Sequence, residues 1–245
     1  MKINDRLKMI ANKIPHCTVL ADIGTDHAYI PIYAVLNGLC RRALAADVRA
    51  GPLKMADKNI KRYGLEKSIE TRLGNGLEPI SSTECDVIVI AGMGGTLIRD
   101  ILLTSIEKAQ CAKMLLLQPN NAVDVLRKWL YESGFDIDEE LLALDAGKLY
   151  SIIKAKWTGI PVEKDEFTYY IGEKLLGGND PLLQIYLTKK VKELEVIITG
   201  RSQSDPNKSN DAVYVTGMDT ATCIDIRNRL LEYTERKEMY DDNMS

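Results

Sequence analysis

Two aspartates flank a glycine in residues 19–38, "VLADIGTDHAYIPIYAVLNG". The stretch has the layout of a nucleotide-binding turn: an apolar strand, a glycine, a short loop and an apolar helix. A loop that cradles a diphosphate needs a second glycine, and Asp26 takes that place here. At about 4 Å and an effective dielectric constant near 20, each carboxylate–phosphate repulsion costs roughly 4 kcal/mol. A dinucleotide such as NAD or FAD is therefore not expected.

A cationic cofactor fits this loop better. S-adenosylmethionine (SAM) has no phosphate, and acidic side chains attract its sulfonium and ammonium groups. Asp26 also suits a helix N-cap, and the two roles are compatible. A structural place beside the helix start is an equal alternative for His27. The residues of this loop expected to contact SAM are Asp22, Gly24, Thr25, Asp26 and His27.

Two later positions fall in register with this loop. A ligand with a ribose needs an acidic residue at the end of the second strand, and "ALAADVRAG" (43–51) provides Asp47 there. In "RLGNGLEPI" (72–80), the Asn75 amide could bind the edge of the adenine, while Gly76 lets the backbone come close. The structural alternatives are an N-cap for Asp47 and a simple turn for the GNG sequence.

A third glycine-rich segment, "AGMGG" (91–95), follows the fourth predicted strand. We interpret Gly92, Gly94 and Gly95 as a shelf without side chains beside the methyl group, with Met93 flanking the cofactor or the base. The free N–H groups at the following helix start could also hold an anion. The alternative is a tight strand-to-helix turn.

These residues need a parallel sheet to bring them together. Apolar runs alternate with amphipathic patterns, which predicts βαβ units and a mainly parallel sheet that binds its ligand at the carboxyl ends of the strands. Residues 135–157 read as an antiparallel pair around "AGK" that finishes the sheet edge. The predicted strands are 16–24, 41–48, 69–76, 85–95 and 112–119, and the predicted helices are 28–38, 50–64, 95–110 and 121–134.

The C-terminal part has a different pattern. "TGIPVEKDEF" (158–167) reads as a boundary, so we expect domains at 1–160 and 161–245. Apolar residues at steps of four and three then predict an antiparallel helical pair packed by an a/d seam, with a compact helical cap as the alternative. The tail "DDNMS" is expected to be disordered. The two stripes are Leu183, Leu187, Val191, Leu194 and Ile198, and Cys223, Ile226, Leu230 and Tyr233.

Composition excludes several classes of protein. The chain has 245 residues, 45% hydrophobic and 27% charged, as in ordinary soluble globular proteins. Its apolar runs are shorter than the roughly 18 residues that span a bilayer, and its start has no signal-peptide h-region. Five cysteines without a CxxC pair indicate reduced thiols in the cytoplasm. With only two histidines, no metal cofactor is expected.

Charge is unevenly distributed along the chain. Residues 1–157 hold 21 Lys and Arg against 19 Asp and Glu, a net charge of +2, and the remainder holds 11 against 16, a net charge of -5. Phosphate binding needs only a local basic patch, although a solvated helix face explains such a cluster equally. The basic residues gather at Arg41, Arg42, Arg49, Lys54, Lys58, Lys61 and Arg62.

Four motifs in order carry a family resemblance: "DIGTDHAYIP" (22–31), "ADVRAGPLKMA" (46–56), "IAGMGG" (90–95) and "LLLQPNN" (115–121). Together they resemble the bacterial tRNA (adenine-N1)-methyltransferases that modify the D-loop adenine at tRNA position 22. The resemblance implies a Rossmann-like, SAM-dependent methyltransferase sheet with a small coiled-coil-like domain, tRNA as substrate and 1-methyladenosine as product. The family often has Gly-Asp-Gly where this chain has Asn75.

Catalysis of that methyl transfer depends mostly on positioning the two reactants and on stabilising the charge that develops. Adenine N1 has a lone pair and no proton, and its attack places positive charge on the ring. A carboxylate or amide oxygen would stabilise this charge, and a carboxylate could take the proton later lost from the exocyclic amine. Asp26 is the first catalytic candidate, and Gln118 and Asn120 of "QPNN" are the second.

Other functions remain open. The chain could be a SAM-dependent enzyme acting on a small molecule or a protein, with the helical part as a lid, or a SAM-binding module without activity. If tRNA is the partner, the basic cluster and Lys189, Lys190 and Lys192 are expected to hold it. The acidic balance of the helical part makes packing or dimerisation a rival role, so the oligomeric state is left undecided.

Overall fold

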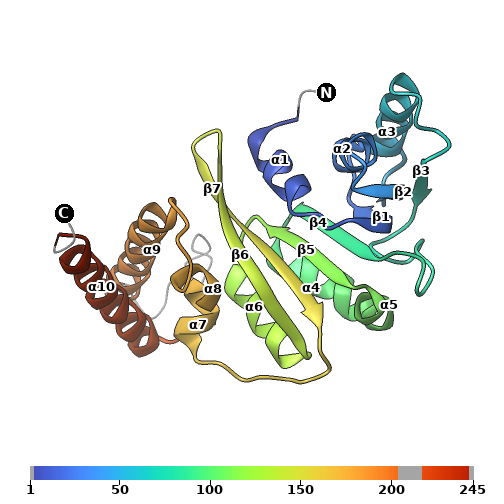
Figure 1. Ribbon diagram of the computed structural model, residues 1–245. Helices are drawn as coiled ribbons and strands as arrows, with labels where there is room; N and C mark the ends of the chain where they lie inside the picture. The colour runs from blue at the N-terminus through green and yellow to red at the C-terminus, as the bar shows by residue number, and fades with distance from the viewer. Residues whose placement is uncertain (1–2, 204–216, 243–245) are drawn as a thin grey trace. The chain divides into compact units, whose positions relative to one another are not determined.

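A computed structural model describes residues 3–203 and 217–242. The chain forms two compact units, Met1–Glu163 and Lys164–Ser245, and each is described by itself. The first unit contains the sheet, and the second is made of helices (Figure 1). Of the polar stretch 201–217 that joins the two stripes, residues 204–216 lie outside the described residues, and so does the end of the tail, 243–245. Residues 201–203 end α9 (Leu183–Gln203), and residues 241–242 end the last helix.

The first unit is built on a seven-stranded sheet with the strand order β3-β2-β1-β4-β5-β7-β6. The first five strands are parallel, and β7 and β6 are antiparallel to their neighbours. This confirms the predicted α/β fold with an antiparallel edge. The strands are β1 (Cys17–Ile23), β2 (Cys40–Asp47), β3 (Ile69–Leu73), β4 (Val87–Met93), β5 (Met114–Pro119), β6 (Phe135–Asp145) and β7 (Lys148–Trp157).

Continuous apolar runs place the central strands in the interior. The last four residues of β1 and the first four of β4 are buried, as expected for a parallel sheet covered on both faces. The β6–β7 hairpin closes at Ala146 and Gly147, both in the left-handed region that a two-residue turn requires. The order of the strands brings the carboxyl ends of β1, β2, β3 and β4 to one edge of the sheet.

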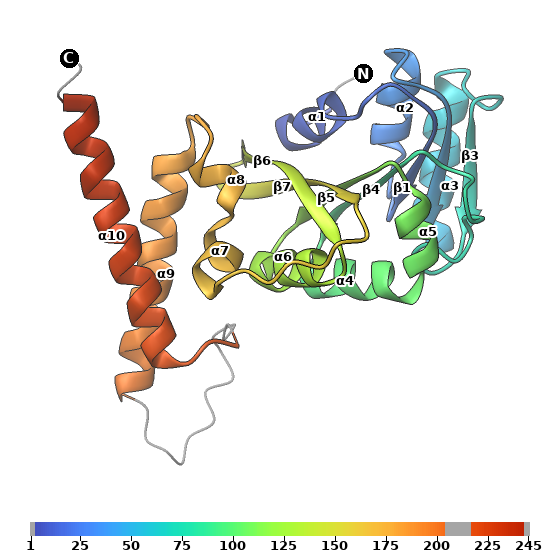
Figure 2. The same cartoon turned by 60° about the horizontal axis from the view of Figure 1, so that its bottom comes forward.

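Helices cover both faces of this sheet (Figure 2). Buried residues of α1, α2 and α3 share one hydrophobic core with strand residues, whereas α4, α5 and α6 lie on the other face. The helices are α1 (Asp5–Asn12), α2 (Tyr29–Leu36), α3 (Ala50–Arg62), α4 (Gly95–Thr104), α5 (Ile106–Cys111) and α6 (Val123–Glu132).

The sequence analysis did not predict helix α1. Its signals were present: Asn4 caps the helix by accepting the backbone N–H of Leu7, and Ile10 and Ala11 are fully buried one turn later. Lys13, just beyond the helix, pairs with Glu139 of β6 at 2.7 Å. Charged residues lie between the apolar positions of this segment, and they make its helical periodicity hard to recognise. The segment was therefore used only as evidence against a signal peptide.

The predicted helix 95–110 is two helices. Ser105 leaves the helical conformation between α4 and α5, with φ -125° and ψ 43°. The hydroxyl of Thr104 donates to the carbonyl of Asp100, and such local hydrogen bonds compete with helix continuation. The break places Ser105 beside a hollow described below.

The second unit contains the predicted helical pair. The helices are α9 (Leu183–Gln203) and α10 (Thr220–Asp242), preceded by the unpredicted short helices α7 (Glu166–Ile171) and α8 (Glu173–Leu176). Most stripe residues are buried, but the stripe of α9 ends on Ile197 rather than Ile198. A 3.5-residue repeat counted from Leu183 leads to position 197, so Ile197 is the residue that continues the a/d seam.

The short helices add aromatic side chains to the core of the second unit. Tyr169 and Tyr170 of α7 are buried, and the hydroxyl of Tyr186 donates to the carbonyl of Ile171 at 3.0 Å. Lys190, predicted to hold RNA, instead lies over the Tyr170 ring at 4.5 Å. Its ammonium also pairs with Glu193 at 2.9 Å, and the side chain is only 16% exposed. We therefore correct that prediction for Lys190.

Within the described part of the chain, no helix is both long and apolar enough to cross a membrane. Residues 3–203 and 217–242 also contain no group of three or more His, Cys, Asp or Glu placed to hold a metal ion.

Candidate functional site

A cavity of about 680 Å³ opens at the carboxyl ends of β1, β2, β3 and β4. This is the edge at which doubly wound sheets bind their ligands. Every residue predicted for the cofactor except Gly94 lines it. The lining comprises Asn4, Arg6 and Leu7; residues 22–27; Tyr29 and Ile30; residues 47–49 and 74–76; residues 91–93; and Leu97 and Ile101.

Asp22 is one of two buried acids of the cavity, with Asp47. Its side chain accepts a hydrogen bond from the hydroxyl of Thr25 at 2.6 Å, and the residue is 4% exposed. Burial raises the pKa of the Asp22 carboxyl to about 7, the Thr25 hydrogen bond opposes this, and the nearby charge of Asp47 raises it further. Such a group gains most from a cationic ligand, which restores its ionised form.

Asp26 is the exposed acid of the cavity. Its side chain is 65% exposed and lies 3.4 Å from Nε2 of His27. The His27 ring stacks on Tyr29, with centroids 5.2 Å apart. The N-cap of α2 is Ala28, without a side-chain hydrogen bond, so the predicted capping role of Asp26 is wrong. Asp26 has φ 41°, which is not a helical conformation, and α2 begins only at Tyr29.

Asp47 ends β2 and shapes the next turn. Its Oδ1 accepts the backbone N–H of Arg49 at 2.8 Å, and the residue is 5% exposed. The N-cap of α3 is Arg49, so the alternative capping role of Asp47 is also wrong. This hydrogen bond turns the chain at the edge where Asp47 lines the cavity.

The absence of a side chain at Gly24 allows Met93 to pack closely against the loop after β1. Gly24 has φ 77°, and a Cβ there would lie 2.1 Å from Cε of Met93. Both residues line the cavity, so Met93 from β4 occupies the space that a side chain at position 24 would fill. The glycine therefore permits contact between two neighbouring loops.

The predicted shelf is confined to Gly92. A Cβ on Gly94 would lie 2.8 Å from Oδ1 of Asn121, and one on Gly95 would lie 2.2 Å from the carbonyl oxygen of Ala122. Gly95 also donates its N–H to the carbonyl of Asn121. The shelf is therefore wrong for Gly94 and Gly95, because these glycines let α4 pack against the segment after β5.

Gln118 does not reach the cavity. It is fully buried, and its Oε1 accepts hydrogen bonds from Arg6 and from the backbone N–H of Gly92. Its Nε2 donates to the carbonyl of Pro119 and to Oδ1 of Asn120. Both lone pairs and both hydrogens of the amide are thus used. The predicted catalytic role of Gln118 is wrong, since no group is left to bind a substrate.

Asn120 belongs to the same network. Its Nδ2 donates to the carbonyl of Gly92 at 2.7 Å, and its backbone N–H donates to the carbonyl of Met93. The Asn120 side chain thereby ties the loop after β5 to the bulged end of β4. Asn120 is exposed but lies outside the cavity lining, so it acts on the site through the backbone of 92–93.

Arg6 is a site residue that the sequence analysis missed. It lines the cavity from α1, bonds to Gln118, and stacks over the Tyr150 ring at 5.4 Å. Finding it required the prediction of α1, because a single arginine near the start of a chain carries no signal. Arg6 connects the helix to β5 and to β7, and so closes one wall of the cavity.

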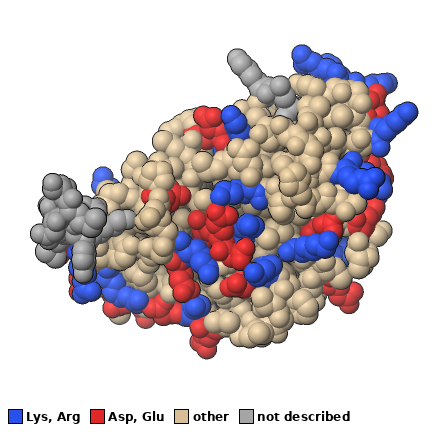
Figure 3. All heavy atoms as spheres, in the orientation of Figure 1, with Lys and Arg blue, Asp and Glu red and all other residues tan. Residues whose placement is uncertain are grey.

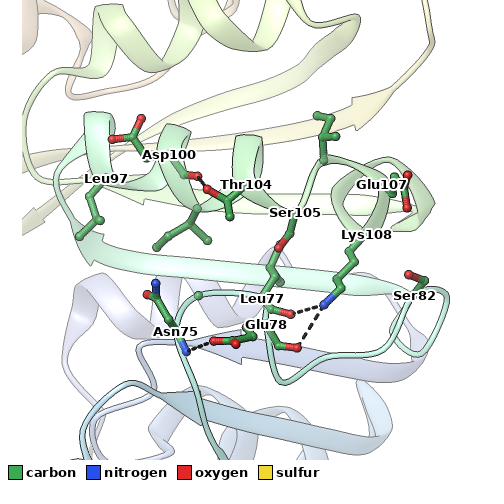
Figure 4. A pocket seen from close by; sticks show the side chains of 13 residues that line it. Asn75, Leu77, Glu78, Ser82, Leu97, Asp100, Thr104, Ser105, Glu107 and Lys108 are labelled. Carbon is green, nitrogen blue, oxygen red and sulfur yellow. Dashed lines mark hydrogen bonds between the residues drawn. The ribbon is translucent and has the colours of Figure 1, made fainter.

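Asn75 and Gly76 line both this cavity and a second hollow of about 670 Å³. Leu97 and Ile101 of α4 are the other shared residues. In Figure 4, the Asn75 side chain points from the loop after β3 toward α4. Lys108 holds this loop, donating to the carbonyls of Leu77 and Glu78 at 2.9 and 3.1 Å.

The predicted basic cluster does not form one patch at the cavity. Arg49 lines the cavity, and Lys54 lies one turn into α3, but Arg41 and Arg42 are at the opposite end of β2. Figure 3 shows Lys and Arg side chains gathered over α3, whereas over β6 and β7 they alternate with acidic ones. Lys156 of β7, for instance, pairs with Asp138 at 3.0 Å.

The cavity fits SAM in size and charge. Its volume falls within the range of about 300–1,000 Å³ typical of small-molecule sites. Three aspartates line it, one of them buried with a raised pKa. This favours a cation and opposes a diphosphate, while Gly24 removes the side chain that would separate the loops.

Comparison with known proteins agrees with this geometry. A family model described as "Methyltransferase domain" matches residues 3–153. The tRNA (adenine(22)-N(1))-methyltransferase of Bacillus subtilis is 40% identical over 156 residues, which span 64% of this chain and 66% of that enzyme. The crystal structure of the B. subtilis enzyme, TrmK, matches with a TM-score of 0.78 and 30% identity, over 96% of this chain and 98% of that one. The chain belongs to the TrmK family.

The predicted family resemblance is thereby confirmed, and it extends to the helical unit, because the structural match covers nearly all of both chains. Two other relatives were solved with ligands. Streptococcus pneumoniae Sp1610, in complex with SAM, has a TM-score of 0.80 and 31% identity, over 95% of this chain and 99% of that one. TrmK of M. capricolum, in complex with S-adenosyl-homocysteine, has a TM-score of 0.75 and 28% identity, over 96% and 98%. TrmK-family proteins thus bind the cofactor predicted here.

Proposed function

We propose that this protein transfers a methyl group from SAM to N1 of adenine 22 in the D-loop of tRNA. The observation that carries the proposal is the three-aspartate cavity at the carboxyl edge of a TrmK-family sheet. Asp22, Asp26 and Asp47 favour a cationic cofactor, and no phosphate-binding glycine pair competes with that role. A tRNA substrate also implies that the protein works in the cytoplasm.

Each part of the cofactor has a matching group in the cavity. We assign Asp47, at the end of β2, to the ribose and the Asn75 amide to the edge of the adenine, because both line the cavity. Asp22 and Asp26, with Gly24 and Thr25, form the loop that receives the charged methionine end. Bound SAM supplies an electrophilic methyl group on a sulfonium.

Asp26 is the catalytic residue of the proposal. It is the exposed carboxylate at the cavity, so a base entering from solvent meets it first. Its negative charge stabilises the positive charge that develops on the adenine ring. The same carboxylate accepts the proton later lost from the exocyclic amine. His27, within 3.4 Å of Asp26, and Tyr29 stacked on His27 form the adjoining wall.

Gln118, Asn120 and Arg6 are positioning residues. Their hydrogen bonds fix the carbonyl and N–H of Gly92, and Asn120 also holds the backbone of Met93. These two residues, from the end of β4, line the cavity beside the loop that holds Asp26. A rigid wall there keeps the acceptor base from shifting, and such positioning accounts for much of the catalysis in an in-line displacement.

The target adenine must leave its stack to enter the cavity. Folded tRNA presents mainly backbone and shape to a protein, so phosphate contacts should position it. Arg49 at the cavity and Lys54 and Lys58 on α3 are exposed and lie on one path from the site. We assign the first contacts with tRNA to these three residues.

The test is a methylation assay with unmodified tRNA transcripts. The protein is incubated with labelled SAM and a tRNA carrying adenine 22, then the RNA is digested to nucleosides. We expect 1-methyladenosine from this tRNA and none from a matched transcript with guanine at position 22. Label in N6-methyladenosine, or label that persists in the guanine-22 transcript, would overturn the proposed site of methylation.

The competing function is methyl transfer to a small molecule or a protein. In that case, turnover would occur without RNA, and the protein would bind SAM while leaving every tRNA unlabelled. The same assay with a cell extract treated with ribonuclease distinguishes the two, since only the alternative survives removal of RNA.

A further inference from the structure

We propose that Cys17 and Cys40 form a peroxide-sensitive dithiol at the amino edge of the sheet, in which Cys17 is oxidised first and Cys40 closes the disulfide. The two cysteines are direct partners in the parallel register of β1 and β2. Neighbouring strands lie about 4.8 Å apart. This falls within the range of about 4.4–6.8 Å that separates the Cα atoms of disulfide-bonded cysteines. Both side chains pack on the same face of the sheet, against the core beneath α1, α2 and α3.

The two thiols differ in access to solvent. Cys17 is partly exposed and opens onto a hollow of about 510 Å³, together with His16, Asp86 and Lys113. Cys40 lies beneath it and is only 4% exposed. A small oxidant therefore reaches Cys17 first, while Cys40 is shielded from solvent but adjacent to Cys17.

The hydrogen bond within the pair favours the thiolate on Cys17. The hydrogen bond from the Cys40 thiol lowers the pKa of Cys17, and Lys113 lowers it further, against the opposing effects of burial and Asp86. The same hydrogen bond raises the pKa of Cys40. His16 faces the same hollow, and its Nδ1 lies 3.2 Å from the carbonyl of Gly38. Low pKa and access together make a cysteine sensitive to oxidation.

Cys85, the third cysteine in this region, is not suited to either role. It is 8% exposed, and burial raises the pKa of its thiol to about 12. It lies in the loop before β4 and has no register partner among the cysteines of β1 and β2. The pairing of strands thus selects Cys40 as the resolving thiol.

The reaction balances with hydrogen peroxide as the oxidant. The Cys17 thiolate attacks one peroxide oxygen, which forms an S–O bond, breaks the O–O bond and releases hydroxide. The sulfur of Cys40 then attacks the sulfenic acid, so the S–S bond forms as the S–O bond breaks. The proton of the Cys40 thiol leaves with the departing hydroxide as water. Two thiols lose two electrons, and one peroxide becomes two waters.

The linkage joins two strands at their amino ends, opposite the cavity. Side chains directly across from each other on parallel strands must move slightly together to reach disulfide geometry, and a strained disulfide is readily reduced. We therefore expect the bond to be reversible by a dithiol, as suits a protein from a reducing compartment.

Peptide mapping of the full-length protein tests the proposal. The protein is treated with hydrogen peroxide in increasing amounts, free thiols are blocked, and the digest is analysed by mass spectrometry. We expect a peptide containing linked Cys17 and Cys40, which disappears on treatment with dithiothreitol. Cys111, which is exposed, serves as the internal comparison and should be oxidised only at higher peroxide. A Cys17–Cys85 link, or oxidation of Cys111 first, would overturn the proposal.

Three variants sharpen the test. Cys40→Ser should leave Cys17 as a sulfenic acid that dimedone traps and that more peroxide converts to the sulfinic acid. Cys17→Ser should leave Cys40 unmodified, and Cys111→Ser should form the link as the unmodified protein does. If Cys40→Ser leaves the oxidation products of Cys17 unchanged, Cys40 is not the resolving thiol. The mapping of the unmodified protein stands even where a variant fails to fold.

Discussion

Burial favours the protonated form of the Asp22 carboxyl, whereas a cationic ligand favours its ionised form. Its carboxyl has a pKa of about 7 without ligand, so near neutral pH it is partly protonated. A cationic ligand favours the ionised form, and binding therefore releases a proton at pH 6 but not at pH 8. We expect the affinity of the protein for SAM, divided by that of Asp22→Asn, to increase as pH rises from 6 to 8. Isothermal titration calorimetry at pH 6, 7 and 8 measures this ratio, in which the titration of SAM itself cancels.

The same variant carries a stability control. Folding raises the pKa of the Asp22 carboxyl from near 4 to about 7. The protonated carboxyl therefore contributes fully to stability below pH 4, and this contribution is lost as pH rises through 7. Asp22→Asn should accordingly unfold at a higher temperature than the unmodified protein at pH 8, and the difference should narrow as pH falls to 5. A ratio of affinities that is flat from pH 6 to 8 would contradict the role given to Asp22.

Asp26 needs a variant that respects its backbone. Its φ of 41° lies in the left-handed region, which Asn adopts more readily than Ala. Asp26→Asn therefore removes the charge alone, and we expect kcat to fall by about 100-fold or more, because an electrostatic contact to the reacting base is lost. Single-turnover methylation of tRNA measures this. Glu78→Gln, which removes a carboxylate from the second hollow, should keep normal turnover; a normal rate in Asp26→Asn would exclude Asp26 from catalysis.

The residue types of the site could be predicted, but their partners could not. Asp22, Asp47 and Asn75 follow successive strands, so the order of elements alone brought them together. Gln118 was misassigned because its partner Arg6 is 112 positions away and on an unpredicted helix. Hydrogen bonds between distant segments leave no periodic pattern in a sequence.

Helices and strands with regular apolar spacing were predictable, and helices with interrupted apolar spacing were not. All seven strands and the helical pair followed from apolar spacing, whereas α1 and α7 were missed because charged or polar neighbours interrupt theirs. The same limit hides a buried ion pair. Arg127 of α6 donates to Glu140 of β6 at 2.7 Å, with both side chains fully buried.

This ion pair fastens α6 to the antiparallel edge. Arg127→Ala would leave a buried carboxylate without its cation, and we expect a loss of about 3–5 kcal/mol in the free energy of unfolding. Lys156→Ala, which removes an exposed pair on the neighbouring strand, should change it by less than about 1 kcal/mol. Urea denaturation followed by circular dichroism compares the two. Equal losses in both variants would mean that Arg127 contributes no more than a surface charge.

For the whole molecule, the distribution of charge determines which surface can bind tRNA. The chain has a net charge of -3, so tRNA binding depends on where the basic residues lie. Arg6 and Arg49 line the cavity, and Lys54 and Lys58 lie exposed on α3. Lys113 lies at the opposite edge of the sheet, in an ion pair with Asp86. In our proposal the cavity edge receives both SAM and tRNA, whereas the cysteine pair lies at the other edge.

Salt dependence measures these phosphate contacts. Each contact releases condensed counterions, so the logarithm of the binding constant for tRNA should fall linearly with the logarithm of salt concentration. We expect the double variant Arg49→Ala, Lys58→Ala to bind tRNA more weakly and to reduce the steepness of that line by about 1–2. Lys113→Ala should leave the slope unchanged. Filter binding from 50 to 200 mM salt, roughly the range over which counterion release dominates, provides the slopes. If the double variant keeps the slope of the unmodified protein, tRNA approaches the cavity over another surface.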